Sequence, residues 1–314
     1  EALNIDPDYA DAHNNLGVLY GKIGLATDAL KSFEMAIELM VKRLTISPVD
    51  FNTLNNLGIA FFEIERFEES MATYQKALTI KPNMADIWNN LGTVFQKLNQ
   101  NKDAIKSFEK AYFIKPDIDY ILGNLLGAKM NSCDWDGLAE LIHDAQKRID
   151  RNGKVIDLYT LTGIIDDPKL QNKAAELFTK FHYPKNSTYP AIDQYLKHPK
   201  IRIGYFSADF REHPVGFLTA QLYELHDKNE FEVHAFSLDP DSTVDNINLR
   251  IKAGVDHFHD VNKMSHKEVA LFARSLEIDI AIDLGGFTHE SRTDIFAMSA
   301  APIQLSYIGY LGTM

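Results

Sequence analysis

A repeat with a fixed period fills the first half of the chain. Asn56-Leu57-Gly58 returns as Asn90-Leu91-Gly92, 34 residues later, and after a further 34 residues the chain has Asn124-Leu125. An earlier copy is Asn15-Leu16-Gly17. Other columns of the repeat hold aromatic residues and alanine, namely Tyr20, Phe61 and Phe95; Phe33, Tyr74 and Phe108; and Ala36, Ala77 and Ala111. Self-similarity at a period of about 20–50 residues predicts one small structural unit that is built several times and stacked.

The pattern resembles the tetratricopeptide repeat over residues 1–148. That family has a 34-residue unit of two helices, with large apolar residues, Leu-Gly, Ala and a closing proline at fixed offsets. Two short helices are marginal alone, so the copies are expected to stack and bury one continuous core. Pro82 and Pro116 should end the second helix of their units, because proline lacks the backbone N–H that continues a helix. We therefore predict an α-solenoid for this half.

Two copies depart from the pattern. Leu16 and Leu57 are 41 residues apart, and the surplus falls near Glu38–Ser47, where we predict about two additional helical turns. The fourth copy, Ile118–Asp150, lacks the glycine of the others, as expected of a terminal unit that packs against something else. Glu1–Pro7 should be the tail of a preceding unit.

One column of the repeat is asparagine in every copy: Asn15, Asn56, Asn90 and Asn124. An amide side chain both donates and accepts hydrogen bonds, so it can satisfy the N–H and C=O groups of a peptide backbone without reading its sequence. On the first helix of each unit, these residues would form a ladder along a peptide-binding groove. The alternative is that each amide makes hydrogen bonds within its own repeat.

Composition argues against several classes of protein. The net charge of −12 argues against a nucleic-acid partner, because such binding rests on Lys and Arg neutralising phosphates. No apolar run approaches the roughly 18 residues that a membrane span needs, so no membrane partner is expected. The single cysteine, Cys133, excludes an intramolecular disulfide and fits a reducing compartment, so we expect a cytoplasmic protein.

The second half of the chain has a different period. Turn-forming residues mark residues 149–199 as a helical and loop linker, with one helix at Ala174–Phe181. Residues 200–314 alternate between apolar runs and helix-like segments, as a parallel sheet requires. The expected strands are Ile201–Phe206, Phe231–Leu238, Asp256–Val261, Asp279–Leu284 and Ile303–Ile308, and the expected helices are Phe217–Leu225, Val244–Ala253 and Ser265–Leu276, the last with a Ser265–Glu268 capping box. We predict a Rossmann-like, doubly wound lobe.

The turn after the first of these strands carries the best candidates for chemistry. Asp209 and His213 lie four residues apart on this turn, and doubly wound domains bind ligands at the carboxyl ends of their strands. The alternative is structural: Asp209 caps the next helix and His213 is a solvated surface residue. The loop Gly285–Arg292 follows another strand and should face the same crevice.

Neither a cofactor nor a metal is expected. The spacing of Gly285 and Gly286 is not that of a dinucleotide-binding fingerprint. The histidines of this half are scattered: His226, His234, His257, His259 and His266. None of them has the spacing of a zinc-ligand motif.

Three ordered motifs resemble the protein O-GlcNAc transferase family, in its bacterial branch. They are Asp209-Phe210-x-x-His213-Pro214, then Asp283-Leu284-x-Gly286-x-Thr288, and finally Ala301-Pro302-x-Gln304 leading to Gly309-Tyr310-x-Gly312-Thr313. Together with the repeats, the resemblance covers essentially the whole chain. It implies tetratricopeptide repeats followed by the first Rossmann-like lobe of a GT-B glycosyltransferase. We expect the chain to be cut at both ends, with the second lobe beyond Met314.

The resemblance also implies a reaction, the inverting transfer of N-acetylglucosamine from UDP-GlcNAc to Ser and Thr hydroxyls of acceptor proteins. His213 and Asp209 match positions that are candidates for handling the hydroxyl proton. Positions around the donor sugar match Pro214, Val215, Gly312 and Thr313. The asparagine column matches the ladder by which the family holds its protein acceptors. Because the second lobe supplies most donor contacts in this family, the chain alone is expected to be nearly inactive.

Two other interpretations stay open. One is a non-enzymatic repeat scaffold for protein–protein interaction, with a degenerate lobe. The other is an enzyme of the same fold that uses another UDP-sugar, since no residue named here reads the N-acetyl group. The presence of Asp209, His213, Gly312 and Thr313 favours an enzyme. The exposed surface of the repeats also leaves self-association into a homo-oligomer open.

Overall fold

The computed structural model describes residues 2–184, 192, 195, 198–288 and 291–309. The chain divides into two compact units, Glu1–Leu177 and Phe178–Met314. The first unit thus continues past residue 148 into the stretch expected to be a linker. Among the described helices, none combines the length and the apolar character that a membrane crossing requires.

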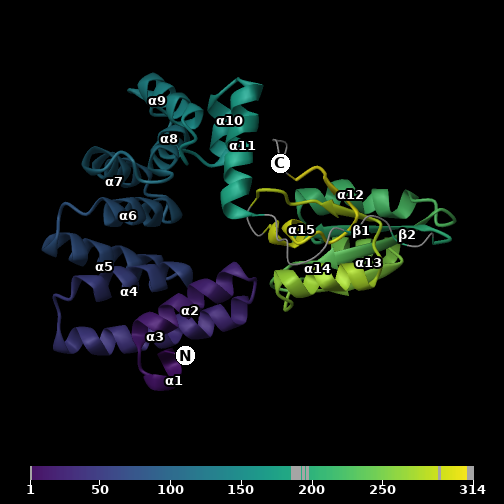
Figure 1. The fold of residues 1–314 in the computed structure, drawn as a ribbon, viewed down its shortest axis with the longest axis horizontal. Coiled ribbons are helices and arrows are strands. Elements are labelled where there is room, and N and C mark those ends of the chain that lie inside the picture. Colours follow the sequence, from purple (N-terminus) through teal and green to yellow (C-terminus); the bar gives the residue numbers. More distant parts are fainter. Residues whose placement is uncertain (1, 185–191, 193–194, 196–197, 289–290, 310–314) are drawn as a thin grey trace. The chain divides into compact units, whose positions relative to one another are not determined.

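The first unit is a stack of helix pairs (Figure 1). Its helices are α1 (Ala2–Ile5), α2 (Ala10–Lys22), α3 (Ala26–Ile46), α4 (Phe51–Glu63), α5 (Phe67–Ile80), α6 (Ala85–Lys97), α7 (Asn101–Ile114), α8 (Ile121–Asn131), α9 (Leu138–Asp150) and α10 (Leu158–Ile164), and α11 (Pro168–His182) runs across the unit boundary. As predicted, α5 and α7 end just before Pro82 and Pro116. The predicted insertion is confirmed, because α3 has 21 residues and α5 has 14.

A continuous apolar core joins the repeats. Buried residues from α4 through α8 form one cluster, in which Leu54, Leu91 and Leu125 are almost completely buried on the first helices of successive units. A second cluster, around Phe33 and Met40 of α3, extends the core through the first repeat. This is the stacking that the repeat period predicts.

The glycine of the repeat lets its two helices approach closely. A Cβ placed on Gly92 in α6 would lie 2.6 Å from the ring of Phe108 in α7, and one placed on Gly58 would lie 2.5 Å from the ring of Tyr74. Both rings are buried, and a close-packed interior leaves them little room to move aside. The glycine column and the aromatic column therefore form two sides of one packing contact.

We expect Gly92→Val to lower the free energy of unfolding of the repeats by about 1–3 kcal/mol, the usual cost of forcing extra carbon atoms into a packed interior. Gly21→Val is the matched control, because a Cβ at Gly21 in α2 would meet no atom within 4 Å. Urea unfolding of the full chain, followed by far-UV circular dichroism, measures both variants. Equal stability of the two variants would contradict this account of the packing.

The stretch that follows α9 is tied to the last repeat. Gly123 N donates a hydrogen bond to Val155 O at 2.9 Å, so the chain after α9 runs along the start of α8. Helix α10 was not predicted from the sequence. Its N-cap residue is Asp157, and the carboxylate of Asp157 accepts a hydrogen bond from Thr160 N at 2.8 Å. The predicted helix Ala174–Phe181 lies within α11, which begins six residues earlier.

The second unit is a parallel sheet with helices on both faces. Its strands are β1 (Ile201–Ser207), β2 (Phe231–Ser237), β3 (His257–Asp260), β4 (Ile280–Asp283) and β5 (Ile303–Ser306), and its helices are α12 (Pro214–Leu225), α13 (Asn246–Gly254), α14 (His266–Ser275) and α15 (Asp294–Ala297). The strand order is β3-β2-β1-β4-β5, and every neighbouring pair is parallel. Each strand lies where the sequence analysis predicted it, and the capping box of Ser265 and Glu268 is confirmed.

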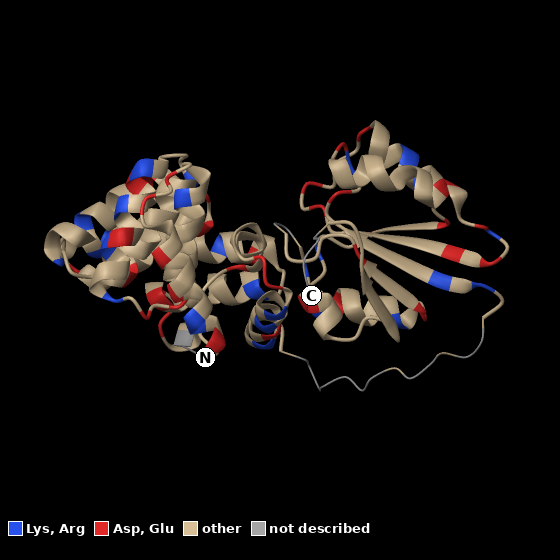
Figure 2. Cartoon of the chain, turned by 90° about the horizontal axis from the view of Figure 1, so that it is seen from above, with Lys and Arg blue, Asp and Glu red and all other residues tan. Residues whose placement is uncertain are grey.

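Two apolar layers fix which helices cover which face. Phe206 of β1 packs in a cluster with Val269 of α14 and Ile295 of α15. Tyr205, its neighbour in the strand, packs on the other face with Tyr223 of α12. Side chains alternate between faces along a strand, so α12 and α13 cover one face and α14 and α15 the other. Figure 2 shows helices on either side of the fanned strands.

Candidate active site

The order of the strands reverses between β1 and β4. From β1 the chain builds outward to β2 and β3, and it then returns to the other side of β1 with β4 and β5. In doubly wound sheets, ligands bind in the crevice at this reversal, outside the carboxyl ends of the strands. Asp209 and His213 follow β1, and Gly285 follows β4. The fold thus brings the two predicted loops to the same end of neighbouring strands.

The loop after β1 is held in place by hydrogen bonds from both sides. Asp209 N donates to Ser207 Oγ, which is itself buried, at 2.9 Å. A buried bond of 2.7 Å from Asn248 Nδ2 in α13 to Phe210 O anchors the middle of the loop. The backbone that carries the candidate residues is therefore positioned by the scaffold before any ligand binds.

His213 is the N-cap of α12. Its Nδ1 accepts a hydrogen bond from Val215 N at 3.3 Å and lies 3.5 Å from Asp209 Oδ2. The structural alternative drawn from the sequence was wrong about the cap: the histidine, rather than Asp209, occupies it, because the ring nitrogen reaches an N–H group that the first helical turn leaves free. The side chain of His213 is 40% exposed and that of Asp209 is 16% exposed. The more exposed imidazole can therefore contact a ligand, whereas the carboxylate of Asp209 is mostly buried.

Two partners compete for Nδ1 of His213. When Nδ1 accepts from Val215 N, the neutral ring carries its proton on Nε2. When Nδ1 donates to the carboxylate of Asp209, Nε2 is unprotonated and can accept a proton from a hydroxyl group. A carboxylate that holds Nδ1–H is the arrangement by which an imidazole is oriented as a general base. The Asp209–His213 pair has the elements of such a base.

Asp283, at the end of β4, is a candidate site residue to which the sequence analysis assigned no role. Its Oδ1 accepts from Gly285 N at 2.9 Å and from Gly286 N at 3.0 Å. Its Oδ2 is buried and has no hydrogen-bond partner among the described residues. Burial raises the pKa of this carboxyl, against the lowering effect of the two backbone hydrogen bonds. A buried acceptor without a partner at the strand reversal suits a hydrogen-bond donor on a ligand. The signal in the sequence was an aspartate near the end of the apolar run Asp279–Leu284.

The residues expected around the donor sugar are described only in part. Pro214 is the exposed first residue of α12. The side chain of Val215 is buried in the apolar cluster beneath α12, and its backbone N–H is turned to His213. Gly312 and Thr313 lie outside the described residues. The roles of these four positions toward a sugar stay predictions.

The asparagine column runs along the first helices of the repeats: Asn15 in α2, Asn56 in α4, Asn90 in α6 and Asn124 in α8. Two of these side chains bond to the neighbouring repeat, because Asn56 Nδ2 donates to Asp11 Oδ1 at 2.8 Å and Asn124 Nδ2 donates to Asn89 Oδ1 at 3.0 Å. A third, Asn90, shares a hydrogen bond with the hydroxyl of Tyr74 in the preceding repeat. These three bonds run between repeats, whereas Asn56 Oδ1 also accepts from Asn55 Nδ2 at 3.4 Å within its own repeat, as the structural alternative expected. Each amide has a second N–H donor, and the peptide-binding ladder stays a prediction.

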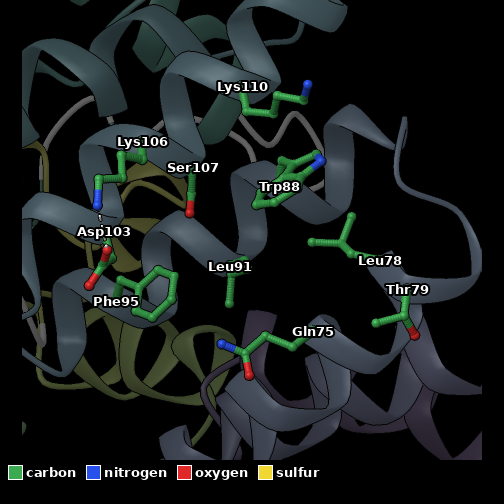
Figure 3. Close-up of a pocket in the computed structure, with 10 residues that line it drawn as sticks. All are labelled: Gln75, Leu78, Thr79, Trp88, Leu91, Phe95, Asp103, Lys106, Ser107 and Lys110. Carbon is green, nitrogen blue, oxygen red and sulfur yellow. Dashed lines mark hydrogen bonds and ion pairs between the residues drawn. The ribbon is translucent and has the colours of Figure 1, made fainter.

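Two pockets flank α6. The smaller, of about 260 Å³, is lined by Asn90, Thr93 and Tyr74 together with Ile59, Phe62 and the acidic Glu63 of α4. The larger, of about 680 Å³, lies between α5, α6 and α7 (Figure 3). Its lining residues are Gln75, Leu78, Thr79, Trp88, Leu91, Phe95, Asp103, Lys106, Ser107 and Lys110. Asn90 thus lines a pocket with both apolar and polar walls.

Comparison with known proteins agrees with the motifs. Residues 165–314 match the profile of glycosyl transferase family 41. Tetratricopeptide repeat profiles match residues 1–24, 58–99 and 85–118. The chain therefore joins tetratricopeptide repeats to family 41 sequence, as the sequence motifs predicted.

The curated relatives are much longer than the part of them that matches this chain. An Arabidopsis thaliana protein named as a probable UDP-N-acetylglucosamine–peptide N-acetylglucosaminyltransferase is 38% identical over 114 residues, which cover 36% of this chain and 12% of that protein. The Caenorhabditis elegans UDP-N-acetylglucosamine–peptide N-acetylglucosaminyltransferase is 35% identical over 118 residues, covering 36% of this chain and 10% of that protein. A solved O-GlcNAc transferase from Thermobaculum terrenum aligns at 22% identity with a TM-score of 0.53, covering 96% of this chain and 51% of that one. This chain shares the fold of the Thermobaculum terrenum protein and spans about half of that protein's length.

Proposed function

We propose that the full product of the gene transfers N-acetylglucosamine from UDP-GlcNAc to Ser and Thr hydroxyls of acceptor proteins. The observation that carries this proposal is the Asp209–His213 pair at the carboxyl end of β1, in residues that match the family 41 profile. Two curated relatives bear the name of this activity. In the proposal the repeats hold the acceptor. The reaction takes place in the cytoplasm, in keeping with the single, unpaired Cys133.

The acceptor hydroxyl attacks C1 of the sugar from the face opposite UDP. The bond between C1 and the diphosphate oxygen breaks as the new C1–O bond forms, its electron pair leaves with UDP, and the configuration inverts. A serine hydroxyl is a weak nucleophile at neutral pH and needs a base. Nε2 of His213 takes the hydroxyl proton while Asp209 holds Nδ1–H, and such assistance typically contributes about 10²–10⁴-fold. We include no metal and no other cofactor in this step.

Mass spectrometry of proteins from a bacterial host that expresses the full gene product tests the proposal. We expect N-acetylhexosamine on Ser and Thr residues, and its loss when the host expresses His213→Asn instead. A different sugar on the same residues would assign the enzyme to another UDP-sugar. No modification of any protein, with peptide binding by the repeats intact, would overturn the proposal in favour of a scaffold.

The asparagine column gives a separate prediction. The combined substitution of Asn56, Asn90 and Asn124 by alanine should raise the KM for a protein acceptor by at least about 10-fold, because each of the three lost hydrogen bonds typically costs about 0.5–1.5 kcal/mol. The kcat should change little, since these residues lie on the repeats. Asn52→Ala is the matched control, because Asn52 is an exposed asparagine of α4 outside the column. Acceptor titrations in the transfer assay measure the KM and kcat of both variants. An unchanged KM in the triple variant would contradict the peptide-binding ladder.

A further inference from the structure

Three metal-binding side chains meet across two neighbouring strands. Glu232 and His234 are two residues apart in β2 and so lie on the same face of the sheet. His257 of β3 is the register partner of His234. One ligand atom from each of the three lies within 4.8 Å of the others. No motif spacing in the sequence joins these residues, because the pairing of β2 with β3 brings them together.

The distances from Glu232 to the two histidines are close to those between ligands of a tetrahedral metal site. His257 Nε2 lies 2.9 Å from Glu232 Oε1, and His234 Nε2 lies 3.6 Å from the same oxygen. Two ligands on one tetrahedral zinc ion, at bond lengths near 2.0–2.1 Å, are about 3.3 Å apart. His234 is 4% exposed, and its Nε2 is buried without a hydrogen-bond partner in the described part of the chain. Such a nitrogen is rare in a folded protein, and a bound metal ion would supply the missing partner.

Neighbouring groups hold these ligands in a suitable state. His234 Nδ1 lies 3.0 Å from His259 Nε2. When Nδ1–H donates to His259, the lone pair of Nε2 points to the site, as it does in metal-binding histidines whose other nitrogen is hydrogen-bonded. Arg202 Nε donates to Glu232 Oε2 at 3.1 Å and leaves Oε1 to the site.

We propose that Glu232, His234 and His257 bind one zinc ion. Two imidazoles and one carboxylate are a ligand set that suits Zn²⁺, and the fourth position is left to water. The side chain of His257 is 47% exposed, which gives the ion access from solvent. The site lies near the amino ends of β2 and β3, whereas Asp209 and His213 follow the carboxyl end of β1. The ion therefore has a structural role: it ties β3, which ends the strand order, to β2.

Zinc titration by calorimetry into the untagged, metal-free full chain tests this site. Cys133 is an exposed free thiol, so every variant carries Cys133→Ser to remove that competing ligand. We expect one zinc equivalent per chain and a higher unfolding temperature of the sheet-containing unit with zinc. His257→Ala should bind at least about 100-fold more weakly. His143→Ala, which removes an exposed histidine of α9, should bind as the parent does.

A second variant tests the role of the neighbouring histidine. His259→Phe keeps all three ligands and removes the acceptor for His234 Nδ1–H, so it should weaken zinc binding by roughly 10- to 100-fold. Circular dichroism confirms that each variant is folded before titration. No zinc binding by the parent up to millimolar concentration, or equal affinity in His257→Ala and His143→Ala, would overturn the proposal.

Discussion

Replacing His213 with asparagine in the full gene product is expected to reduce sugar transfer by about 10²–10⁴-fold, the typical contribution of a positioned general base. Asparagine is among the best N-cap residues, so this variant keeps the cap on α12. Alanine would remove the base together with the hydrogen bond from Val215 N. The measurement is the initial rate of transfer from radiolabelled UDP-GlcNAc to protein.

The control for this variant is His143→Asn, which makes the same change at an exposed position of α9. It should transfer at the wild-type rate. If the folded His213→Asn protein also transfers at the wild-type rate, His213 does not act as the base. The match to the family 41 profile rests on residues 165–314 as a whole and would be unaffected.

Asp209→Asn is expected to lower kcat by about 10²–10⁴-fold, because it changes which ring nitrogen of His213 carries the proton. An amide donates to Nδ1, whereas the carboxylate at 3.5 Å accepts from it. The variant therefore favours the ring with its proton on Nε2, which cannot accept another from the hydroxyl. Because Asp209 acts through His213, the KM for UDP-GlcNAc should change little. Steady-state kinetics over a range of pH measure the effect.

The pH profile separates positioning from a purely structural role. A positioning role predicts that the pH dependence of kcat changes in Asp209→Asn and is partly restored in Asp209→Glu. A structural role would instead lower the unfolding temperature and leave the shape of the profile as it is. A wild-type kcat and pH profile in Asp209→Asn would contradict the pairing of Asp209 with His213.

The repeats were predictable because every repeat makes the same packing contact between its two helices. Gly58 and Tyr74 face one another as Gly92 and Phe108 do, so a column in the sequence is also a contact in space. The longer α3 followed from the surplus of seven residues, because added residues within an amphipathic helix extend it. In the lobe, each apolar β-branched run became a strand of the parallel sheet.

The features that were not predicted depend mostly on contacts between residues far apart in the sequence, which a local pattern does not indicate. α10 was missed because its length, seven residues, is too short for a helical period to show. The bond between Asn56 and Asp11 joins residues 45 positions apart. The buried Oδ2 of Asp283, which has no partner among the described residues, could be recognised only from the fold, in which Oδ1 accepts from Gly285 N and Gly286 N. Similarly, strand register rather than spacing placed His257 beside His234.

Sugar transfer in vitro tests most directly whether the gene product is a protein glycosyltransferase. The full gene product is incubated with radiolabelled UDP-GlcNAc and a mixture of cell proteins, and the label is then mapped to residues. We predict N-acetylglucosamine on Ser and Thr side chains, with inverted configuration at C1 and with the label lost in His213→Asn. No transfer from UDP-GlcNAc or any other UDP-sugar, by a folded protein whose repeats bind peptide, would contradict the account.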